Sequence, residues 1–125
     1  MELKRILLID DEEDIRRVAS ISLEKIGKFE LVTAASGEEG IAVASREMPD
    51  LIILDMMMPG MDGFTTIARL KETEGVSNIP VIFMTAKTQL TEKSDFIASG
   101  ACGVIEKPFD PMTLSDEVRR IADSL

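Results

Sequence analysis

The chain has 125 residues, the size of one ordinary domain, with 45% hydrophobic and 30% charged residues, as in globular proteins. Its net charge of −9 disfavours direct binding to nucleic acid or to an anionic membrane. The absence of histidine excludes histidine-ligated zinc and Ser/His/Asp catalysis, and the single cysteine, Cys102, excludes an intrachain disulfide. Without a signal peptide or membrane-spanning run, residues 1–125 are expected to form a single domain in the cytoplasm.

Short apolar runs alternate along the chain with amphipathic segments. The apolar runs predict buried strands at residues 5–10, 29–34, 50–55, 79–85 and 102–106. The helical spacing of apolar residues predicts helices that follow these strands, over about 12–26, 36–48, 64–71, 88–99 and 111–125. Ser36 with Glu39 forms a capping box, Gly27 and Gly100 suit helix ends, and Asp110 before Pro111 suits a helix start.

This alternation of strands and helices predicts the fold class. Strands joined through helices form a parallel sheet with helices on both faces. Right-handed crossovers then give a doubly wound α/β fold with a five-stranded parallel sheet, a flavodoxin-like (βα)₅ three-layer sandwich. Ligands of such folds bind at the carboxyl ends of the strands, so the polar residues there are the candidates for function.

Five polar residues lie at those strand ends. The first strand runs into Asp10 and Asp11, the third ends in Asp55, the fourth ends in Thr85, and the fifth runs into Lys107. Clustered carboxylates repel one another unless a cation neutralises them, and Mg²⁺ takes oxygen ligands of this kind. A carboxylate can attack phosphorus, and Mg²⁺, an ammonium group and a hydroxyl group stabilise the transition state. Each residue alone could be a cap, a turn former or a surface residue, but together they point to phosphoryl transfer onto Asp55.

The same residues resemble the receiver domain of two-component response regulators, the single-domain, chemotaxis-regulator-like kind. The matching motifs are LLIDDEEDIRR at 7–17, DLIILDMMMPGMDG at 50–63, VIFMTA at 81–86 and KPF at 107–109. The resemblance covers essentially the whole chain. It implies that Asp55 is the phosphoacceptor, and that Asp11, Asp55 and the backbone carbonyl of Met57 hold Mg²⁺ with help from Asp10.

The resemblance also implies roles for the other strand ends and for partners. Lys107 would pair with the phosphoryl oxygens and have a cis bond to Pro108, and Thr85 would be the switch hydroxyl. The donor would be a sensor histidine kinase or a histidine phosphotransfer protein, and the domain would itself catalyse the transfer and a slow hydrolysis. A downstream protein would bind the face formed by the fourth helix, fifth strand and fifth helix. Many receivers carry Tyr or Phe where this chain has Val104, so an aromatic readout is in doubt.

Three alternatives remain beside this interpretation. A phosphatase of the haloacid-dehalogenase type also uses an aspartate nucleophile, but it needs a DxD motif after its first strand, where this chain has Asp10-Asp11-Glu12. A flavin-binding module would need a first loop rich in Ser, Thr and Gly, and here that loop is acidic. A receiver acting only as a scaffold is disfavoured by the intact set of five residues. The acidic balance and the lack of a DNA-binding module in the sequence, which stops at Leu125, favour a stand-alone receiver over a piece of a longer regulator.

Overall fold

The structure is a computed structural model that describes residues 2–86 and 93–125. Five parallel strands form one sheet in the order β2-β1-β3-β4-β5, which confirms the predicted doubly wound fold. The strands are β1 (Arg5–Ile9), β2 (Glu30–Ala34), β3 (Leu51–Asp55), β4 (Val81–Ala86) and β5 (Gly103–Lys107). β4 starts two residues later than predicted, after Pro80, which has no N–H group to donate to a neighbouring strand.

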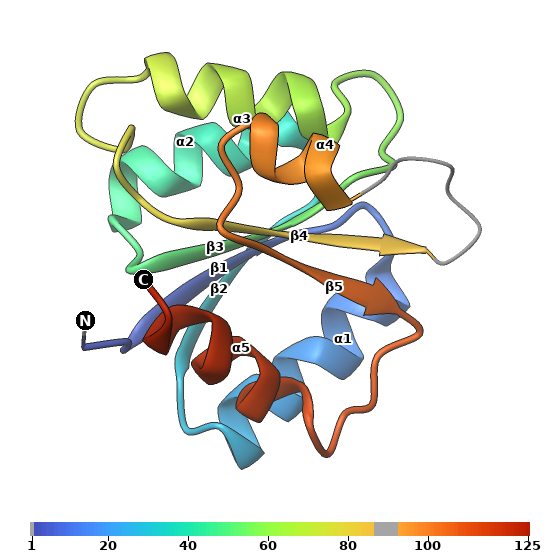
Figure 1. The fold of residues 1–125 in the computed structure, drawn as a ribbon. Helices are drawn as coiled ribbons and strands as arrows, with labels where there is room; N and C mark the ends of the chain where they lie inside the picture. Colours follow the sequence, from blue (N-terminus) through green and yellow to red (C-terminus); the bar gives the residue numbers. More distant parts are fainter. Residues whose placement is uncertain (1, 87–92) are drawn as a thin grey trace.

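Helices cover both faces of the sheet, as Figure 1 shows. One face packs against α2 (Gly37–Glu47), α3 (Gly63–Glu72) and α4 (Lys93–Ala98), and the other against α1 (Glu13–Ile21), its π-helical continuation η1 (Ser22–Ile26) and α5 (Leu114–Asp123). Alternate strand residues supply two separate cores: Leu7, Ile52 and Phe83 point into one, and Leu8, Ile53 and Ile82 into the other. This three-layer packing fixes the strand ends relative to one another.

The helix ends agree with the sequence at some positions and differ at others. Ser36 Oγ accepts a hydrogen bond from the amide of Glu39 at 3.1 Å, as the capping box predicts. The first helix reaches Ile26, but its last five residues are π-helical. The last helix begins at Leu114 rather than at Pro111, because Asp110 instead caps a turn through the amide of Met112. The predicted helix over 88–99 is seen from Lys93, and residues 88–92 lie outside the described part of the chain.

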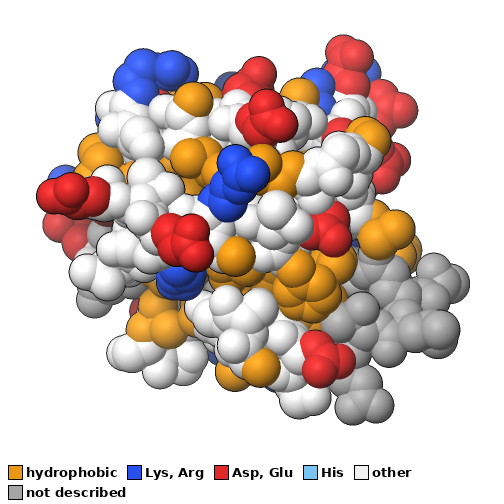
Figure 2. Space-filling model, turned by 90° about the horizontal axis from the view of Figure 1, so that it is seen from above, with side chains coloured by type: hydrophobic (Ala, Val, Ile, Leu, Met, Phe, Trp, Pro, Cys, Tyr) orange, Lys and Arg blue, Asp and Glu red, His pale blue; other side chains and the backbone are white. Residues whose placement is uncertain are grey.

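The surface over α2, α3 and α4 has no dominant charge. Figure 2 looks onto this side and shows acidic and basic side chains scattered among small apolar areas. Among the described residues, no helix has both the length and the apolar character needed to span a membrane. The distinctive chemistry therefore lies at the carboxyl edge of the sheet.

Candidate phosphoacceptor site

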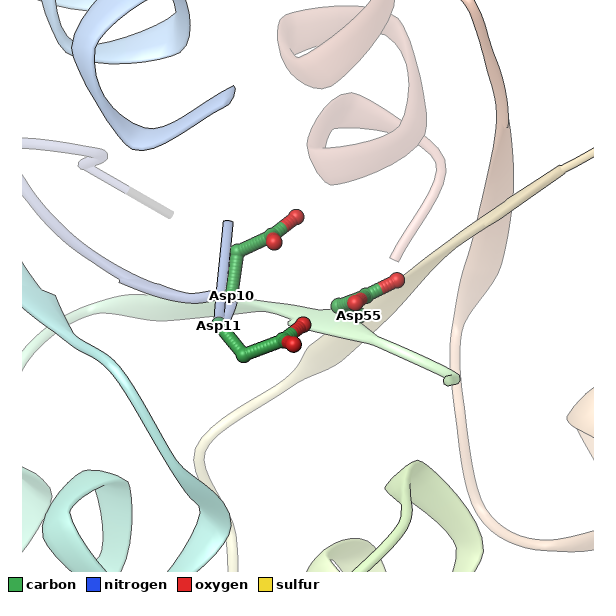
Figure 3. A group of neighbouring side chains, drawn as sticks. All are labelled: Asp10, Asp11 and Asp55. Atoms are coloured by element: carbon green, nitrogen blue, oxygen red, sulfur yellow. The ribbon is translucent and has the colours of Figure 1, made fainter. Parts of the chain in front are cut away.

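Three carboxylates meet where β1 and β3 end. Asp10 and Asp11 directly follow β1, and Asp55 is the last residue of β3. The two strands are neighbours in register, with Ile9 opposite Leu54, so the residues that follow them are adjacent in space. One carboxylate oxygen from each aspartate lies within 4.8 Å of the others. Figure 3 shows the three side chains extending from these strand ends toward a common space.

Lys107 brings a positive charge to this cluster. It is the last residue of β5, and its Nζ lies 2.9 Å from Asp10 Oδ2, 3.1 Å from Asp55 Oδ1 and 3.8 Å from Glu12 Oε1. Its bond to Pro108 is cis, as the resemblance implies. The ammonium group is shared between the first two carboxylates by charge-assisted hydrogen bonds, which are stronger than neutral ones.

The cluster holds more negative than positive charge in a largely buried setting. Asp10 is fully buried and Asp55 is 4% exposed. Burial raises the pKa of Asp55 to about 6, the charge of Asp10 adds to this effect, and Lys107 opposes it. Burial alone lowers the pKa of Lys107, but its hydrogen bonds and charge interactions with Asp10 and Asp55 leave that pKa raised overall. Three carboxylates beside one ammonium group therefore favour binding of a further cation.

The donor set fits Mg²⁺. Both side-chain oxygens of Asp10 accept hydrogen bonds, Oδ1 from the amide of Glu12 at 2.9 Å and Oδ2 from Lys107. Asp11 is half-buried, and its carboxylate accepts no hydrogen bond from the described residues. All three side chains offer only hard oxygen ligands, which Mg²⁺ prefers. Asp11 and Asp55 are thus the best placed to hold the ion. That the backbone carbonyl of Met57 is a further ligand of Mg²⁺ remains a prediction.

Thr85 adds a hydroxyl group at the same edge of the sheet. It lies next to the end of β4, one position beyond Met84, which is the register partner of Asp55. Its Oγ1 is buried and has no hydrogen-bond partner among the described residues, which is uncommon for a buried hydroxyl. Thr85 also borders a groove of about 670 Å³ that includes Phe96, Val104 and Phe109.

The loop after Asp55 depends on a glycine whose role the sequence analysis did not identify. The amide of Gly63 donates to the carbonyl of Met56 at 2.8 Å. A Cβ atom at Gly63 would lie 2.9 Å from the carbonyl oxygen of Asp55 and 2.7 Å from the ring of Phe83. Only glycine lets α3 start this close to the acceptor strand. The Asp-Gly pair at 62–63, with Asp62 capping α3, was the available signal.

The fold and these contacts define a class of protein. A flavodoxin-like sandwich with clustered carboxylates, a lysine and a hydroxyl at one edge is suited to accept a phosphoryl group on an aspartate. It lacks the glycine-rich first loop that would hold a nucleotide or flavin phosphate.

Comparison with known proteins identifies the family. The sequence profile of the response regulator receiver domain matches residues 6–119, and the chain belongs to this family. Receiver domains are the phosphoacceptors of two-component systems, are phosphorylated by histidine kinases and bind Mg²⁺ at the acidic pocket. The family assignment sets aside the phosphatase and flavin alternatives.

Relatives and solved structures agree with this assignment. The chain is 40% identical to the DNA-binding dual master transcriptional regulator RpaA of Synechocystis, covering 95% of this chain and 49% of RpaA. It is 38% identical to the response regulator PleD of Caulobacter vibrioides, covering 94% of this chain and 26% of PleD. The chemotaxis protein CheY4 of Vibrio cholerae superposes with a TM-score of 0.86 at 32% identity, covering 96% of this chain and 99% of CheY4.

The chain spans half or less of the length of these two curated relatives, which are 49% and 26% covered. RpaA is named as a DNA-binding transcriptional regulator. This name goes against the expectation of no direct binding to nucleic acid, and it describes the longer protein, of which the chain covers 49%.

Proposed function

We propose that Asp55 is the phosphoacceptor of this receiver domain, which we take to be a single domain over residues 1–125 acting in the cytoplasm. A phosphohistidine on a sensor kinase or phosphotransfer protein is the donor. The observation that carries the proposal is the shared ammonium group of Lys107, within 3.1 Å of both Asp10 and Asp55. It brings the acceptor, a second carboxylate and a cation into one buried cluster.

The chemistry follows from these contacts. A carboxylate oxygen of Asp55 attacks phosphorus, a P–O bond forms, and the P–N bond to the donor breaks. The donor imidazole, already protonated on its other ring nitrogen, keeps the electron pair of the broken bond and leaves as the neutral ring. With a pKa of about 6, Asp55 is mostly ionised at neutral pH and can act as the nucleophile. Lys107 lies where it can move from Asp55 Oδ1 to the phosphoryl oxygens. Mg²⁺, held by Asp11, Asp55 and the carbonyl of Met57 with Asp10 nearby, would neutralise charge on those oxygens.

The response to phosphorylation starts at Thr85. A phosphoryl group on Asp55 would offer strong acceptor oxygens to a hydroxyl that has no partner among the described residues. Movement of Thr85 would reshape the groove that it shares with Val104 and Phe96. This groove lies on the face of α4, β5 and α5, where we place the binding site of a downstream protein. Because Val104 has no ring, the change passes through packing and backbone rather than through an aromatic rotamer.

The test is phosphoryl uptake by an Asp55→Asn variant. The chain is incubated with phosphoramidate and Mg²⁺, and intact mass is measured. The control variant is Asp123→Asn, at the exposed end of α5. We expect the parent and the control to gain one phosphoryl group and Asp55→Asn to gain none. Because the chain has no histidine, phosphoramidate cannot modify it at that residue type. Equal uptake by Asp55→Asn would contradict the assignment and favour a scaffold role.

A further inference from the structure

We propose that Arg16 is a positioning residue that fixes the turn between β1 and α1 and so sets the affinity of the acidic cluster for Mg²⁺. This turn carries Asp10 and Asp11. The inference depends on the proposed function, because it concerns the same metal site. It assigns a role to a side chain that touches neither the acceptor nor Lys107 in the structure.

The contact that carries the inference spans the turn. Arg16 lies in α1, and its Nη1 donates to the backbone carbonyl of Asp10 at 2.8 Å. Its own amide donates to the carbonyl of Glu12 at 3.0 Å, in the first turn of the helix. The half-buried guanidinium group thus ties the start of α1 to the residue that follows β1. A charged donor makes this bond stronger than an ordinary backbone bond.

The other contacts of Asp10 show why the turn needs this bond. The amide of Asp10 donates to the carbonyl of Ala34 at 3.0 Å, and its carboxylate accepts from Glu12 and Lys107. The remaining acceptor of Asp10 is its backbone carbonyl, to which Arg16 donates. Asp11 lies between these anchored residues and has no side-chain hydrogen bond of its own within the described chain. The direction of its carboxylate is therefore set by the backbone of the turn, which Arg16 holds from the helix side.

The neighbouring arginine provides a matched control. Arg17 is on the same helix and carries the same charge, but it is exposed and pairs only with Glu13 at 3.1 Å and Asp14 at 3.8 Å. Removing either arginine changes the net charge of the chain by one unit. Only removal of Arg16 breaks the bond to the turn. A difference between the two variants therefore reports position rather than long-range charge.

The experiment compares Arg16→Met, Arg16→Lys and Arg17→Met with the parent in the full chain. Mg²⁺ affinity is measured by isothermal titration calorimetry, because the chain has no Trp or Tyr for fluorescence quenching. We expect Arg16→Met to raise the Kd for Mg²⁺ about ten-fold, as is typical when a residue that orients a metal ligand is removed. Arg16→Lys should give a smaller increase, since it keeps a charged donor. Arg17→Met should match the parent.

Two further readouts separate positioning from general destabilisation. At saturating Mg²⁺, Arg16→Met should recover the phosphoryl uptake of the parent. In Mg²⁺-free protein, the amide NMR signals of Asp11 and Glu12 should shift in Arg16→Met and not in Arg17→Met. If Arg16→Met does not fold, Arg16→Lys must still bind Mg²⁺ more weakly than Arg17→Met does.

Equal Kd values in the Arg16 and Arg17 variants, whether raised or unchanged, would overturn the inference. If the parent chain does not bind Mg²⁺ or take up phosphate, the proposed function is wrong. Measurements on the parent chain test the proposed function, whereas the comparison of variants tests the role of Arg16.

Discussion

The two edges of the sheet each hold a cluster of charged residues, and the clusters are built differently. At the amino edge, Asp50 Oδ2 accepts from the amides of Lys4 at 3.0 Å and Arg5 at 2.9 Å. The Arg5 guanidinium donates to Glu30 Oε1 and to the carbonyl of Glu47, both at 2.7 Å. At the carboxyl edge, Asp10 and Asp55 share the ammonium group of Lys107, and Asp11 lies beside them without a hydrogen bond from the described residues.

The difference shows how a structural cluster can be told from a binding cluster. At the amino edge, the chain supplies its own donors to Asp50, so this carboxylate stabilises the fold directly. At the carboxyl edge, Asp11 accepts no hydrogen bond from the described residues, and the hydroxyl of Thr85 has no partner there. Neighbouring carboxylates that lack enough hydrogen-bond donors and positive charges from the chain are placed to bind a cation and to accept a phosphoryl group.

The largest expected effect is weaker Mg²⁺ binding in Asp11→Asn. We expect the Kd for Mg²⁺ to rise by at least about ten-fold, because one charged ligand is removed from the donor set. The free energy of unfolding in Mg²⁺-free buffer should stay equal or increase, because repulsion within the cluster falls. Calorimetric titration and urea unfolding measure the two quantities. An unchanged Kd would remove Asp11 from the metal site.

The matched variant at the amino edge is Asp50→Ala, and it should show the opposite pattern. Two backbone amides lose a charged acceptor, which costs about 2 kcal/mol of unfolding free energy. The Kd for Mg²⁺ should be that of the parent, since Asp50 lies at the other end of the strands. A weaker Mg²⁺ affinity in this variant would show that the two edges are not independent.

A more gradual effect, spread over about two pH units, is expected in the pH dependence of stability. The pKa of Asp55 is raised from 3.8 to about 6 in the folded chain, chiefly by burial. Between these values the folded chain holds a proton that the unfolded chain has released. The free energy of unfolding in Mg²⁺-free buffer should therefore decrease as the pH rises through this window, by up to about 3 kcal/mol, and then level off.

Urea unfolding followed by far-UV circular dichroism measures this dependence. Asp55→Asn removes the titrating group, so the difference in stability between the parent and this variant should change across the window. A constant difference from pH about 4 to about 6 would contradict a raised pKa for Asp55.

Much of the fold and of the site could be predicted from the sequence, because both depend on local pattern. Alternating apolar runs and amphipathic segments define the strands, and the parallel arrangement then places residues at the strand ends on one edge. The parallel order of the strands predicts one shared edge for five polar residues, and the structure places them there: Asp10, Asp11, Asp55, Thr85 and Lys107.

The features that could not be predicted depend on contacts between distant segments. The π-helical turn at Ser22–Ile26 packs on α5. Next to this contact, Ser22 Oγ donates to the carbonyl of Pro111, just before α5, and the Arg119 guanidinium carbon lies 4.2 Å from the ring centre of Phe29, just after the turn. These partners are far apart in the sequence, so no local pattern reveals them. The contact of Arg16 with Asp10 was missed for a related reason, since an arginine in an amphipathic helix is usually solvated.

The most direct test of the account is to locate the phosphoryl group on the chain. The parent is phosphorylated with phosphoramidate and Mg²⁺ and treated at once with sodium borohydride, which reduces an acyl phosphate on aspartate to homoserine. Peptide mass mapping then finds the converted residue. We expect conversion at Asp55, with Asp10 and Asp11 unchanged. Conversion at Asp10 or Asp11 would contradict Asp55 as the phosphoacceptor. Phosphate uptake without conversion of any aspartate would contradict it as well.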